Sequence, residues 1–540
     1  MVGLLTAFTA LILLTAPAAA VPPLHREDHP ADISFCRVNP KAVRNRVAAL
    51  RLAPRFAAPI SSTAYSVAVI RVDFSDETMT KTQAETESFI ASVKSYYLEN
   101  SYNYLTVNGT VSSLYRMPRT HDFYADGLSS DYSTLARDAI AVATTAGFNF
   151  SSYDHVMIYH AGEGAETANS PSNYIWSAYL PAGSVGGPAA SGKTFDGVTF
   201  VPESEFFGVD PLGVICHEYG HQLGLPDLYN TADNQSAVVG YWSLMDTGIY
   251  IGSPLGSNPS HLDPWSKQYL GFSSPETVSF TAGSVKTLTQ VETPPRTSVL
   301  RVPISVSSVG EDNEYFLMEY RRTSGGSYDT ALPGQGLLVW HVDDSIMTNA
   351  TRLAENTVNS EVPHRGLDLV EADADDPSST PNDPGDSTDP WGANQTFQDP
   401  KARAYNGGDS GIAASDISSA GSASISLTLR TALSNPAIAD NTAGGTTVVT
   451  GGAAGYVNPS KGESALIGVL PSQSGAVTVK IYSLAGNLVK ESTVQGTAGQ
   501  NTIVPWNGKN PDGEAVASGI YLIHVRGGGI DQVKKAAVIK

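Results

Sequence analysis

The sequence predicts an α+β protein built from several domains, and three features of the chain lead to this prediction. Strand-like and helix-like periods alternate between residues 61 and 275, which is typical of a mixed domain. Strand-like runs separated by turn residues dominate residues 276–430, which indicates a second, β-rich domain. A Gly- and Thr-rich stretch at 431–455 precedes alternating strands at 456–540, so we expect a flexible linker and then a C-terminal β-sandwich.

The mixed domain begins with a predicted strand. Tyr65–Phe74 is largely apolar, as in a strand that is buried on both faces, and His155–His160 is a second run of this kind. Lys81–Glu99 and Tyr132–Ala146 follow helical periodicity instead. We therefore expect a sheet with helices packed against it.

The other two domains are predicted from runs of strand period between turn residues. In the β-rich domain these runs are Lys286–Val291, Tyr315–Tyr320, Gly336–Val342 and Ala423–Leu429. In the C-terminal domain they are Ala476–Tyr482, Thr502–Trp506 and Gly519–Val525. Asn507-Gly508 and Asp512-Gly513 are turn signals between the last two runs.

Residues 217–227, which read HEYGHQLGLPD, carry the clearest chemical pattern in the chain. Positions four apart lie on the same face of a helix, so His217 and His221 can both bind one metal ion, with Glu218 beside it. With 11 histidines in 540 residues, this spacing is improbable for ordinary polar residues on a surface helix. We predict that His217 and His221 bind zinc and that Glu218 is the catalytic base.

The flanking residues predict a helix that ends just after the second histidine. Asp210 is a suitable N-cap and Pro211 a suitable first residue, and an apolar stripe follows at Leu212, Cys216, Tyr219 and Leu223. Gly224 favours a left-handed turn at the end of the helix, and Pro226 prevents the helix from restarting. The chain then has to reverse beneath the metal, which brings Asp227 forward as the third ligand.

The third ligand has alternatives. In thermolysin-type sites a glutamate some twenty residues later completes the coordination, but no glutamate occurs between Glu218 and Glu276. Asp227 is therefore preferred, and the remaining alternatives are His261, Asp246 and Asp263. Met245 lies where metzincin peptidases carry a methionine turn beneath the metal, although it is equally compatible with a core residue. A metzincin-like zincin domain is the preferred fold for this region.

These residues resemble a known family. The motif with its Gly-Leu-Pro-Asp-Leu-Tyr continuation resembles the immune inhibitor A family of secreted bacterial metallopeptidases. Further similar blocks follow in order along residues 60–430, namely Val67–Ser75, Asn100–Gly109, Pro259–Ser266, Gly334–Asp343 and His364–Asp373. The resemblance implies a secreted zinc endopeptidase that acts on proteins or peptides.

The C-terminal domain resembles a different family. Trp506–Gly513 followed by Ser518–Tyr521 resembles the immunoglobulin-like domain of flagellar hook-capping proteins, and the same fold occurs in sorting domains of type IX secretion. No group of residues in 456–540 indicates chemistry. The resemblance implies a role in binding the cell surface or the secretion machinery.

The N-terminus predicts a secreted protein. Residues 4–15 form a short apolar run, and the small residues Ala16–Ala20 suit signal peptidase, so residues 1–20 are predicted as a signal peptide. A membrane anchor is the alternative, but it needs about 18 uninterrupted apolar residues, and Thr and Pro interrupt this run. We expect a secreted, extracellular protein without a membrane span.

Residues 21–60 are predicted as a propeptide. The segment carries six Lys and Arg residues between 37 and 55, and no acidic residue occurs between Asp32 and Asp73. Asp28, Asp32 or the Cys36 thiolate could occupy the open zinc position and keep a zymogen latent. A solvated helix or a second targeting element is the alternative interpretation.

The two cysteines leave three alternatives open. Cys36 and Cys216 can both be reduced, can form one disulfide, or Cys36 can act as a latch on zinc. A chain with only two cysteines has no disulfide scaffold, so we expect packing to stabilise the fold, with calcium as an additional stabiliser.

Charge excludes one class of partner and suggests a second metal. The chain has 53 acidic and 33 basic residues, a net charge of −20, whereas nucleic-acid binding needs a concentrated positive surface. Residues 368–389 are rich in Asp, namely Asp368, Asp373, Asp375, Asp376, Asp383, Asp386 and Asp389, together with Glu371. This loop suits Ca²⁺, because crowded carboxylates repel one another until a cation neutralises them, and a solvated acidic loop is the alternative.

The sequence leaves two functions of different class. The first is a zinc endopeptidase in which Glu218 is the general base. The second is an adhesive or structural protein that uses the peptidase fold only as a scaffold. An intact Glu218 favours the enzyme, since metal binding alone does not need a base next to the first ligand.

Overall fold

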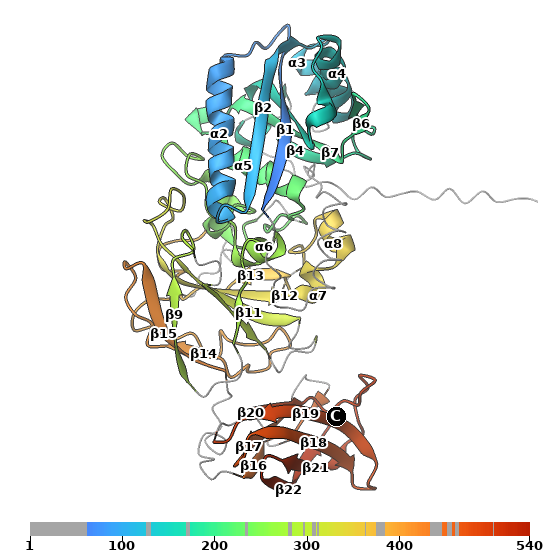
Figure 1. Cartoon of the computed structure of the whole chain (residues 1–540), viewed down its shortest axis with the longest axis vertical. Coiled ribbons are helices and arrows are strands. Elements are labelled where there is room, and N and C mark those ends of the chain that lie inside the picture. The colour runs from blue at the N-terminus through green and yellow to red at the C-terminus, as the bar shows by residue number, and fades with distance from the viewer. Residues whose placement is uncertain are drawn as a thin grey trace, which may run out of the picture.

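The computed structural model describes most of the chain from residue 62 onward. The described residues are 62–125, 131–168, 173–232, 236–278, 283–294, 298–304, 309, 313–361, 363–373, 384–431, 445–450, 456–459, 464–499 and 502–540. The predicted signal peptide at 1–20 and the predicted propeptide at 21–60, with Cys36, lie outside them. The α+β class is confirmed, and three blocks follow one another along the long axis of the molecule (Figure 1).

The first block is a five-stranded sheet with helices on both faces. Its strand order is β2 (Leu105–Arg116), β1 (Thr63–Asp73), β3 (His155–Glu163), β7 (Gly197–Ser204) and β4 (Ala178–Pro181). The first four strands are parallel, and β4 is an antiparallel edge strand. The remaining strands of this region, β5 (Ala189–Ala190) and β6 (Lys193–Thr194), form a separate hairpin.

Alternation along β1 explains why both faces of this sheet are covered. Val67 and Val69 point into a core shared with α2 (Gln83–Asn100) and α5 (Leu212–Leu223). Ala68 and Ile70 point into a second core with α4 (Tyr132–Thr145), which follows the short α3 (His121–Tyr124). The helices predicted at 81–99 and 132–146 and the strands predicted at 65–74 and 155–160 are therefore all present.

The second block contains two sheets. The larger has the order β13 (Leu367–Leu369), β12 (Gly336–Asp343), β11 (Glu314–Arg321), β10 (Val299–Pro303) and β8 (Glu276–Thr277). The smaller has the order β14 (Ala413–Ser415), β15 (Ser424–Arg430) and β9 (Ser284–Thr289). Three short helices, α6 (Pro264–Tyr269), α7 (Asp344–Met347) and α8 (Ala350–Glu355), lie between the first and second blocks (Figure 1).

The first two blocks share one hydrophobic core. On β12, Leu338 and Trp340 pack in the same core as α2 and α5, while Leu337 and Val339 face a separate core under the smaller sheet. A strand of the second block thus contributes side chains to the same core as the helix that carries the HEYGH motif. The domain boundary predicted at 275/276 stays a prediction, but packing is continuous across it.

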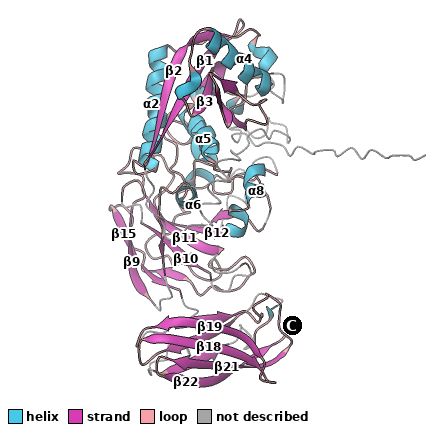
Figure 2. Ribbon diagram, turned by 45° about the vertical axis from the view of Figure 1, so that its right-hand side comes forward, coloured by secondary structure: helices cyan, strands magenta, loops and turns pink. Residues whose placement is uncertain are grey.

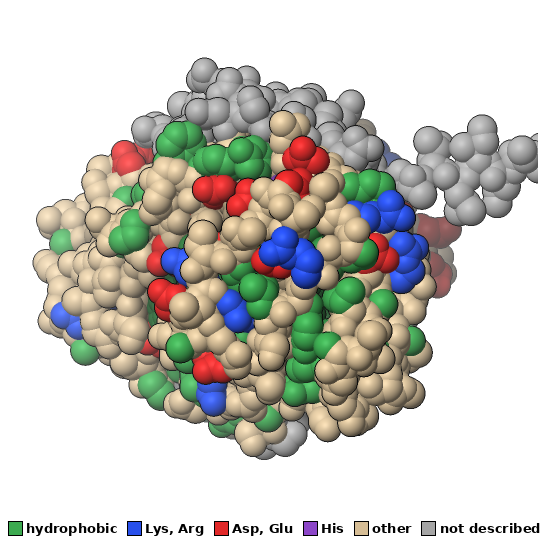
Figure 3. Space-filling model, turned by 90° about the horizontal axis from the view of Figure 1, so that it is seen from above, with side chains coloured by type: hydrophobic (Ala, Val, Ile, Leu, Met, Phe, Trp, Pro, Cys, Tyr) green, Lys and Arg blue, Asp and Glu red, His purple; other side chains and the backbone are tan. Residues whose placement is uncertain are grey.

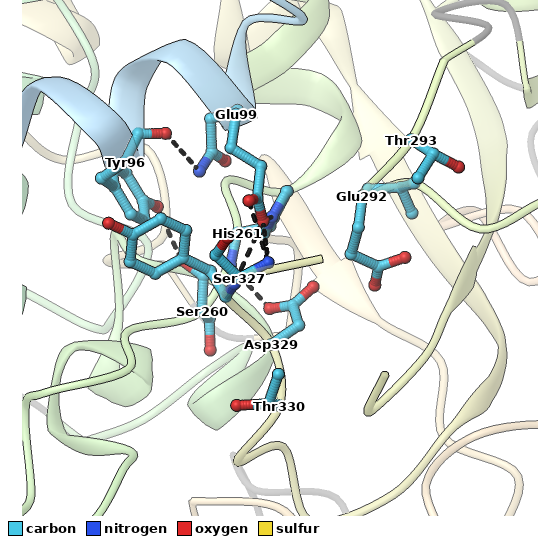
Figure 4. A network of polar contacts seen from close by, with 12 residues as sticks. Tyr96, Glu99, Ser260, His261, Glu292, Thr293, Ser327, Asp329 and Thr330 are labelled. Carbon is cyan, nitrogen blue, oxygen red and sulfur yellow. Dashed lines mark hydrogen bonds and ion pairs between the residues drawn. The ribbon is translucent and has the colours of Figure 1, made fainter. Parts of the chain in front are cut away.

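A buried ionic network also joins the two blocks. Arg321 at the end of β11 donates two hydrogen bonds to Asp329, over 2.7 and 2.9 Å, and one to Glu319, over 3.0 Å. Asp329 accepts the backbone N–H of His261, and His261 Nε2 lies 2.9 Å from Glu99 Oε1 at the end of α2. Figure 4 shows Glu99, His261 and Asp329 converging from three segments of the chain. Because Arg321, Asp329, Glu319 and His261 are buried and Glu99 is partly buried, the fold depends on the balance of charge among them.

The third block is formed by residues from 446 onward and contains two further sheets. One has the order β16 (Thr446–Thr450), β17 (Ala465–Leu470) and β20 (Thr502–Trp506). The other has the order β19 (Leu488–Gly496), β18 (Gly475–Ser483), β21 (Gly519–Gly527) and β22 (Ile530–Val538). Their apolar side chains form one core of their own, and Figure 2 shows this block apart from the rest of the chain.

The predicted linker needs a correction at its C-terminal end. Residues 446–450 lie within the range 431–455 that was predicted as linker, but they form β16 and pair with β17. Their composition, Thr-Thr-Val-Val-Thr, is β-branched throughout and favours a strand, although the surrounding glycines favour a linker. Among the described residues, no helix is long and apolar enough to cross a membrane.

Two carboxyl groups meet where β3 and β7 end. Glu166 and Glu205 are both buried, and one oxygen of each has no hydrogen-bond partner within the described ranges. Thr167 Oγ1 donates to the other Glu205 oxygen over 2.6 Å. Burial raises the pKa of both groups, and the charge of Glu166 raises the pKa of Glu205 further. Folding therefore favours a form of the pair in which the two carboxyl groups share a proton.

Glu205→Gln is expected to gain stability relative to the wild type as the pH rises from 5 to 8. A raised folded-state pKa means that the folded wild type binds the proton more tightly than the unfolded chain, whose carboxyl pKa is about 4.3. Wild-type stability is therefore complete below that value and declines as the pH rises through the folded pKa, whereas glutamine does not ionise. The measurement is the melting temperature of both proteins against pH, with Glu514→Gln, an exposed carboxylate, as control. A difference between the proteins that is constant with pH would contradict a shared proton.

Candidate active site

The helix α5 begins and ends close to the predicted positions. Asp210 Oδ1 accepts the backbone N–H of Leu212 over 3.0 Å, but the helix starts at Leu212, so Pro211 occupies the N-cap position rather than the first helical one. Gly224 ends the helix with φ of +101°, a left-handed conformation that glycine adopts without steric cost. The glycine stop predicted from the sequence is therefore confirmed.

All twelve residues of α5 are buried. The predicted stripe of Leu212, Cys216, Tyr219 and Leu223 lies in the shared core. His217, Glu218 and His221 are equally inaccessible to solvent. Among the described residues Cys216 is a free, buried thiol.

Three side chains converge at the C-terminal half of α5. The Nε2 atoms of His217 and His221 lie 3.1 Å apart. Asp227 Oδ1 lies 2.9 Å from His217 Nε2 and 3.3 Å from His221 Nε2. One ligand atom each from His217, Glu218 and His221 also lies within 4.8 Å of the others. The structure thus brings together the four residues that the sequence singles out.

Backbone carbonyls fix both imidazole rings. His217 Nδ1 lies 2.9 Å from the carbonyl oxygen of Leu244, and His221 Nδ1 lies 2.8 Å from that of Leu225. Each Nδ1 therefore carries the hydrogen and donates it, which leaves a lone pair on Nε2. Carbonyl partners of this kind orient the histidine ligands of metal sites.

The donor set fits zinc. Two imidazole lone pairs and Asp227 Oδ1, an oxygen without a hydrogen-bond partner in the described part of the chain, face a common point. Burial lowers the pKa of His221, but the charges of Asp227 and Glu218 and the hydrogen bonds to Asp227 and the Leu225 carbonyl group together raise it to about 9. Burial raises the pKa of Asp227, and His221 then holds it well below the usual range. Two nitrogens and one carboxylate oxygen form a common protein ligand set of catalytic zinc.

The alternative third ligands are occupied elsewhere. His261 belongs to the buried ionic network, and Asp246 Oδ2 accepts three backbone N–H groups from residues 238–240. Asp263 caps α6 through Ser266 and accepts from Ser243 Oγ. Asp227 is the candidate that the structure places beside both histidines.

Met245 lies against the same helix. A Cβ atom at Gly220 would come within 2.9 Å of Met245 Sδ, so the methionine packs closely against α5 between the two histidines. The Met245 carbonyl oxygen accepts the backbone N–H of Leu228 over 2.8 Å. The segment around Met245 therefore supports both the helix and the chain reversal that carries Asp227.

One residue at this site has no signal in the sequence motif. Asn356, the C-cap of α8, hydrogen-bonds the backbone N–H of Asp227 over 2.7 Å and also donates to Asp227 Oδ2. It lies 129 residues after Asp227 in the chain. A lone asparagine in a polar segment has no periodicity that would mark it as part of a site.

A second group of carboxylates lies in the predicted calcium loop. Ligand atoms of Asp373, Asp386 and Asp389 are within 4.8 Å of one another, and residues 374–383 lie outside the described ranges. Asp389 Oδ2 accepts the Trp242 indole N–H over 2.7 Å. Pro384 in the same loop accepts the backbone N–H of Tyr241, so this loop contacts the segment that leads to Met245.

Two parts of the chain match known protein families. Residues 149–274 match the family model of the immune inhibitor A peptidase M6 catalytic domain, and residues 456–529 match that of the FlgD Ig-like domain. The chain is 29% identical over 219 residues to the pre-pro-metalloprotease PrtV of Vibrio cholerae, covering 34% of this chain and 24% of PrtV. It is 30% identical over 228 residues to immune inhibitor A of Bacillus thuringiensis, covering 34% of this chain and 32% of that protein.

The chain thus spans about a quarter to a third of the length of these relatives. Among solved structures, FlgD from Xanthomonas campestris matches 18% of this chain and 72% of its own, with 23% identity and a TM-score of 0.13. A score this low carries no argument on its own. The resemblances to immune inhibitor A peptidases and to the hook-capping domain are confirmed by the two family models.

Proposed function

We propose that this protein, whose residues 149–274 are a peptidase M6 domain, is a zinc-dependent endopeptidase that hydrolyses peptide bonds in protein substrates. One observation carries the proposal: His217, His221 and Asp227 present three ligand atoms to a common point, with Glu218 beside them. When bound there, zinc supplies a Lewis acid that polarises a carbonyl group and makes water nucleophilic near neutral pH.

In this proposal the residues of the site have two different roles, metal binding and proton transfer. His217, His221 and Asp227 hold the metal and leave a fourth position open for substrate and water. Glu218, the residue next to the first ligand, takes a proton from the attacking water and passes it to the leaving amine. The non-catalytic scaffold is the weaker alternative, because it gives no reason for a carboxylate at position 218.

Metal content and proteolysis together test the proposal. The purified protein is expected to contain one zinc per chain and to digest casein, and removing the metal with a chelator should stop the digestion until zinc is restored. His217→Ala should contain no zinc at this site and show no digestion. A wild-type protein that holds zinc but leaves casein and peptide libraries intact would favour the scaffold, and one that holds no zinc would refute the site.

Finer features of the fold enter as part of the same proposal. We place the catalytic domain among the metzincin-like zincins, with Met245 as the floor beneath the metal, since the methionine packs against α5 at Gly220. We take the two C-terminal sheets around one core as an Ig-like β-sandwich. The Ig-like domain would bind the cell surface or the secretion machinery.

Secretion and latency complete the proposal. The apolar run and small residues at 1–20 support export, and the basic segment at 21–60 supports a propeptide that restrains the active site. Figure 3 shows basic and acidic side chains interspersed on the face it displays, without a continuous basic patch. This distribution supports protein rather than nucleic acid as the substrate.

Calcium is expected to stabilise the protein through the acidic loop. Ca²⁺ takes carboxylate oxygens, and Asp373, Asp386 and Asp389 bring theirs together beside Trp242. A ligand that binds only the folded state adds about 2.7 kcal/mol at 100 times its Kd, so Ca²⁺ titrated into metal-free protein should raise the melting temperature. Asp386→Asn should reduce this rise, while Asp512→Asn, an exposed control, should not. If Ca²⁺ did not change the melting temperature, the alternative interpretation of a solvated acidic loop would be supported instead.

A chain that ends at residue 440 is expected to keep its zinc and its peptidase activity. Among the described residues, the core of the C-terminal block is formed by side chains between 449 and 538, and these are separate from the cores of the first two blocks. The melting transition of the first two blocks should therefore stay within a few degrees of its full-length value. Loss of zinc or of turnover in the truncated chain would show that the C-terminal block supports the active site.

A further inference from the structure

Asn356 holds the carboxylate of Asp227 from two sides. Its side-chain oxygen accepts the backbone N–H of Asp227 over 2.7 Å, and its side-chain N–H donates to Asp227 Oδ2. Both residues are buried, so no water competes for these bonds. One amide thus fixes the backbone and the side chain of the third candidate ligand together.

This contact decides which oxygen of Asp227 faces the histidines. With Oδ2 taken by Asn356, Oδ1 is the oxygen that lies 2.9 Å from His217 Nε2 and 3.3 Å from His221 Nε2. Without the amide, the carboxylate is free to rotate about its last torsion, and either oxygen or neither would point at the metal position. Asn356 therefore restricts Asp227 to the orientation that a ligand needs.

The conformation of Asn356 is itself held in place by its surroundings. Asn356 has φ of +59°, a left-handed conformation that asparagine tolerates better than most residues. Its backbone N–H bonds back to α8 as the helix cap, and its carbonyl oxygen accepts the Thr231 hydroxyl over 2.8 Å. Three residues later, Asn359 donates to the Leu228 carbonyl oxygen over 2.7 Å. The segment 356–359 therefore holds the chain reversal at 227–231 in place through hydrogen bonds.

We propose that Asn356 is a positioning residue for the metal, through which the second block sets the affinity of the active site for zinc. The proposal rests on the proposed zinc site and adds a residue that neither the motif nor the matched range 149–274 contains. Residues that hold a metal ligand typically change metal affinity about 10–100-fold when they are replaced. Because Asn356 belongs to the second block, the zinc affinity should also depend on whether that block is packed against the first one.

The test compares zinc affinity in matched variants of the full chain. Asn356→Gly removes the amide and keeps a residue that accepts φ of +59°, and it is expected to raise the zinc Kd about 10–100-fold. Ser360→Ala removes a hydrogen bond to the Thr357 carbonyl oxygen in the neighbouring turn, and it is expected to raise the Kd by less than about threefold. The Kd is measured by competition with a fluorescent zinc chelator, and the melting temperature of each metal-free protein is measured beside it.

A double-mutant cycle separates positioning from general damage. In an Asp227→Ala background, Asn356→Gly should have almost no further effect on the zinc Kd, because the carboxylate it orients is gone. If Asn356→Gly does not fold, Asn356→Ala is used in the same cycle. An unchanged Kd in the glycine variant, or an equal loss with and without Asp227, would overturn the proposal. Wild-type protein that binds no zinc at all would instead refute the proposed function, so the two failures are distinguishable.

Discussion

Glu218→Gln is expected to lower kcat for peptide hydrolysis by about 10²–10⁴-fold while one zinc remains bound per chain. Glutamine has the shape of glutamate but cannot take up a proton at neutral pH, so attack on the scissile carbonyl loses its base. The zinc ligands in the proposal are His217, His221 and Asp227, so metal content should not change. The measurements are kcat and KM on a fluorogenic peptide and zinc content by elemental analysis.

Two comparisons make this result specific. Glu87→Gln, an exposed carboxylate on α2, should keep wild-type kcat and zinc. His221→Ala should lose both, because it removes a ligand and not the base. A Glu218→Gln protein with wild-type kcat would refute general-base catalysis by Glu218, and one that also lost its zinc would mean that Glu218 helps to hold the metal.

Arg321→Met is expected to destabilise the protein by about 3–5 kcal/mol. Arg321 is fully buried and donates four hydrogen bonds. Two go to Asp329, one to Glu319 and one to the His261 carbonyl oxygen. Methionine fills a similar volume but leaves two buried carboxylates without their counter-charge. The measurement is the urea midpoint and slope of unfolding, and a lower midpoint with an unchanged slope is expected.

The control for this prediction is an exposed arginine. Arg137→Met removes a guanidinium that is 64% exposed and pairs with Asp138 over 3.1 Å. Exposed ion pairs contribute at most about 1 kcal/mol, so this variant should unfold close to the wild-type midpoint. If Arg321→Met unfolded at the same midpoint as Arg137→Met, the network would not stabilise the junction of the two blocks.

The sequence predicts the elements and the motif well, because both depend on local chemistry. Strands such as Gly336–Val342 and the helix that ends at Gly224 follow from periodicity and capping, which residues a few positions apart determine. The grouping of His217 and His221 follows from the geometry of one helical turn. Asp227 could be proposed because Pro226 forces an immediate reversal of the chain.

Features that depend on distant segments could not be predicted in the same way. α5 shares its core with Leu338 and Trp340 of the second block, and this sharing follows only from the packing of distant segments. Asn356 contacts Asp227 across 129 residues, and nothing in its neighbourhood marks that contact. The strand at 446–450 was predicted as part of a linker, because the glycines on either side of its five β-branched residues are typical of flexible linkers.

The core shared by the first two blocks sets the order in which the active site can mature during synthesis. When the ribosome has released the HEYGH helix, the β12 side chains that share its core and the amide that holds Asp227 have not yet been made. Contacts that span more than a hundred residues form late, because the intervening chain must be ordered first. In a newly made chain, the contacts that hold Asp227 beside the two histidines are therefore incomplete until the segment around Asn356 has folded.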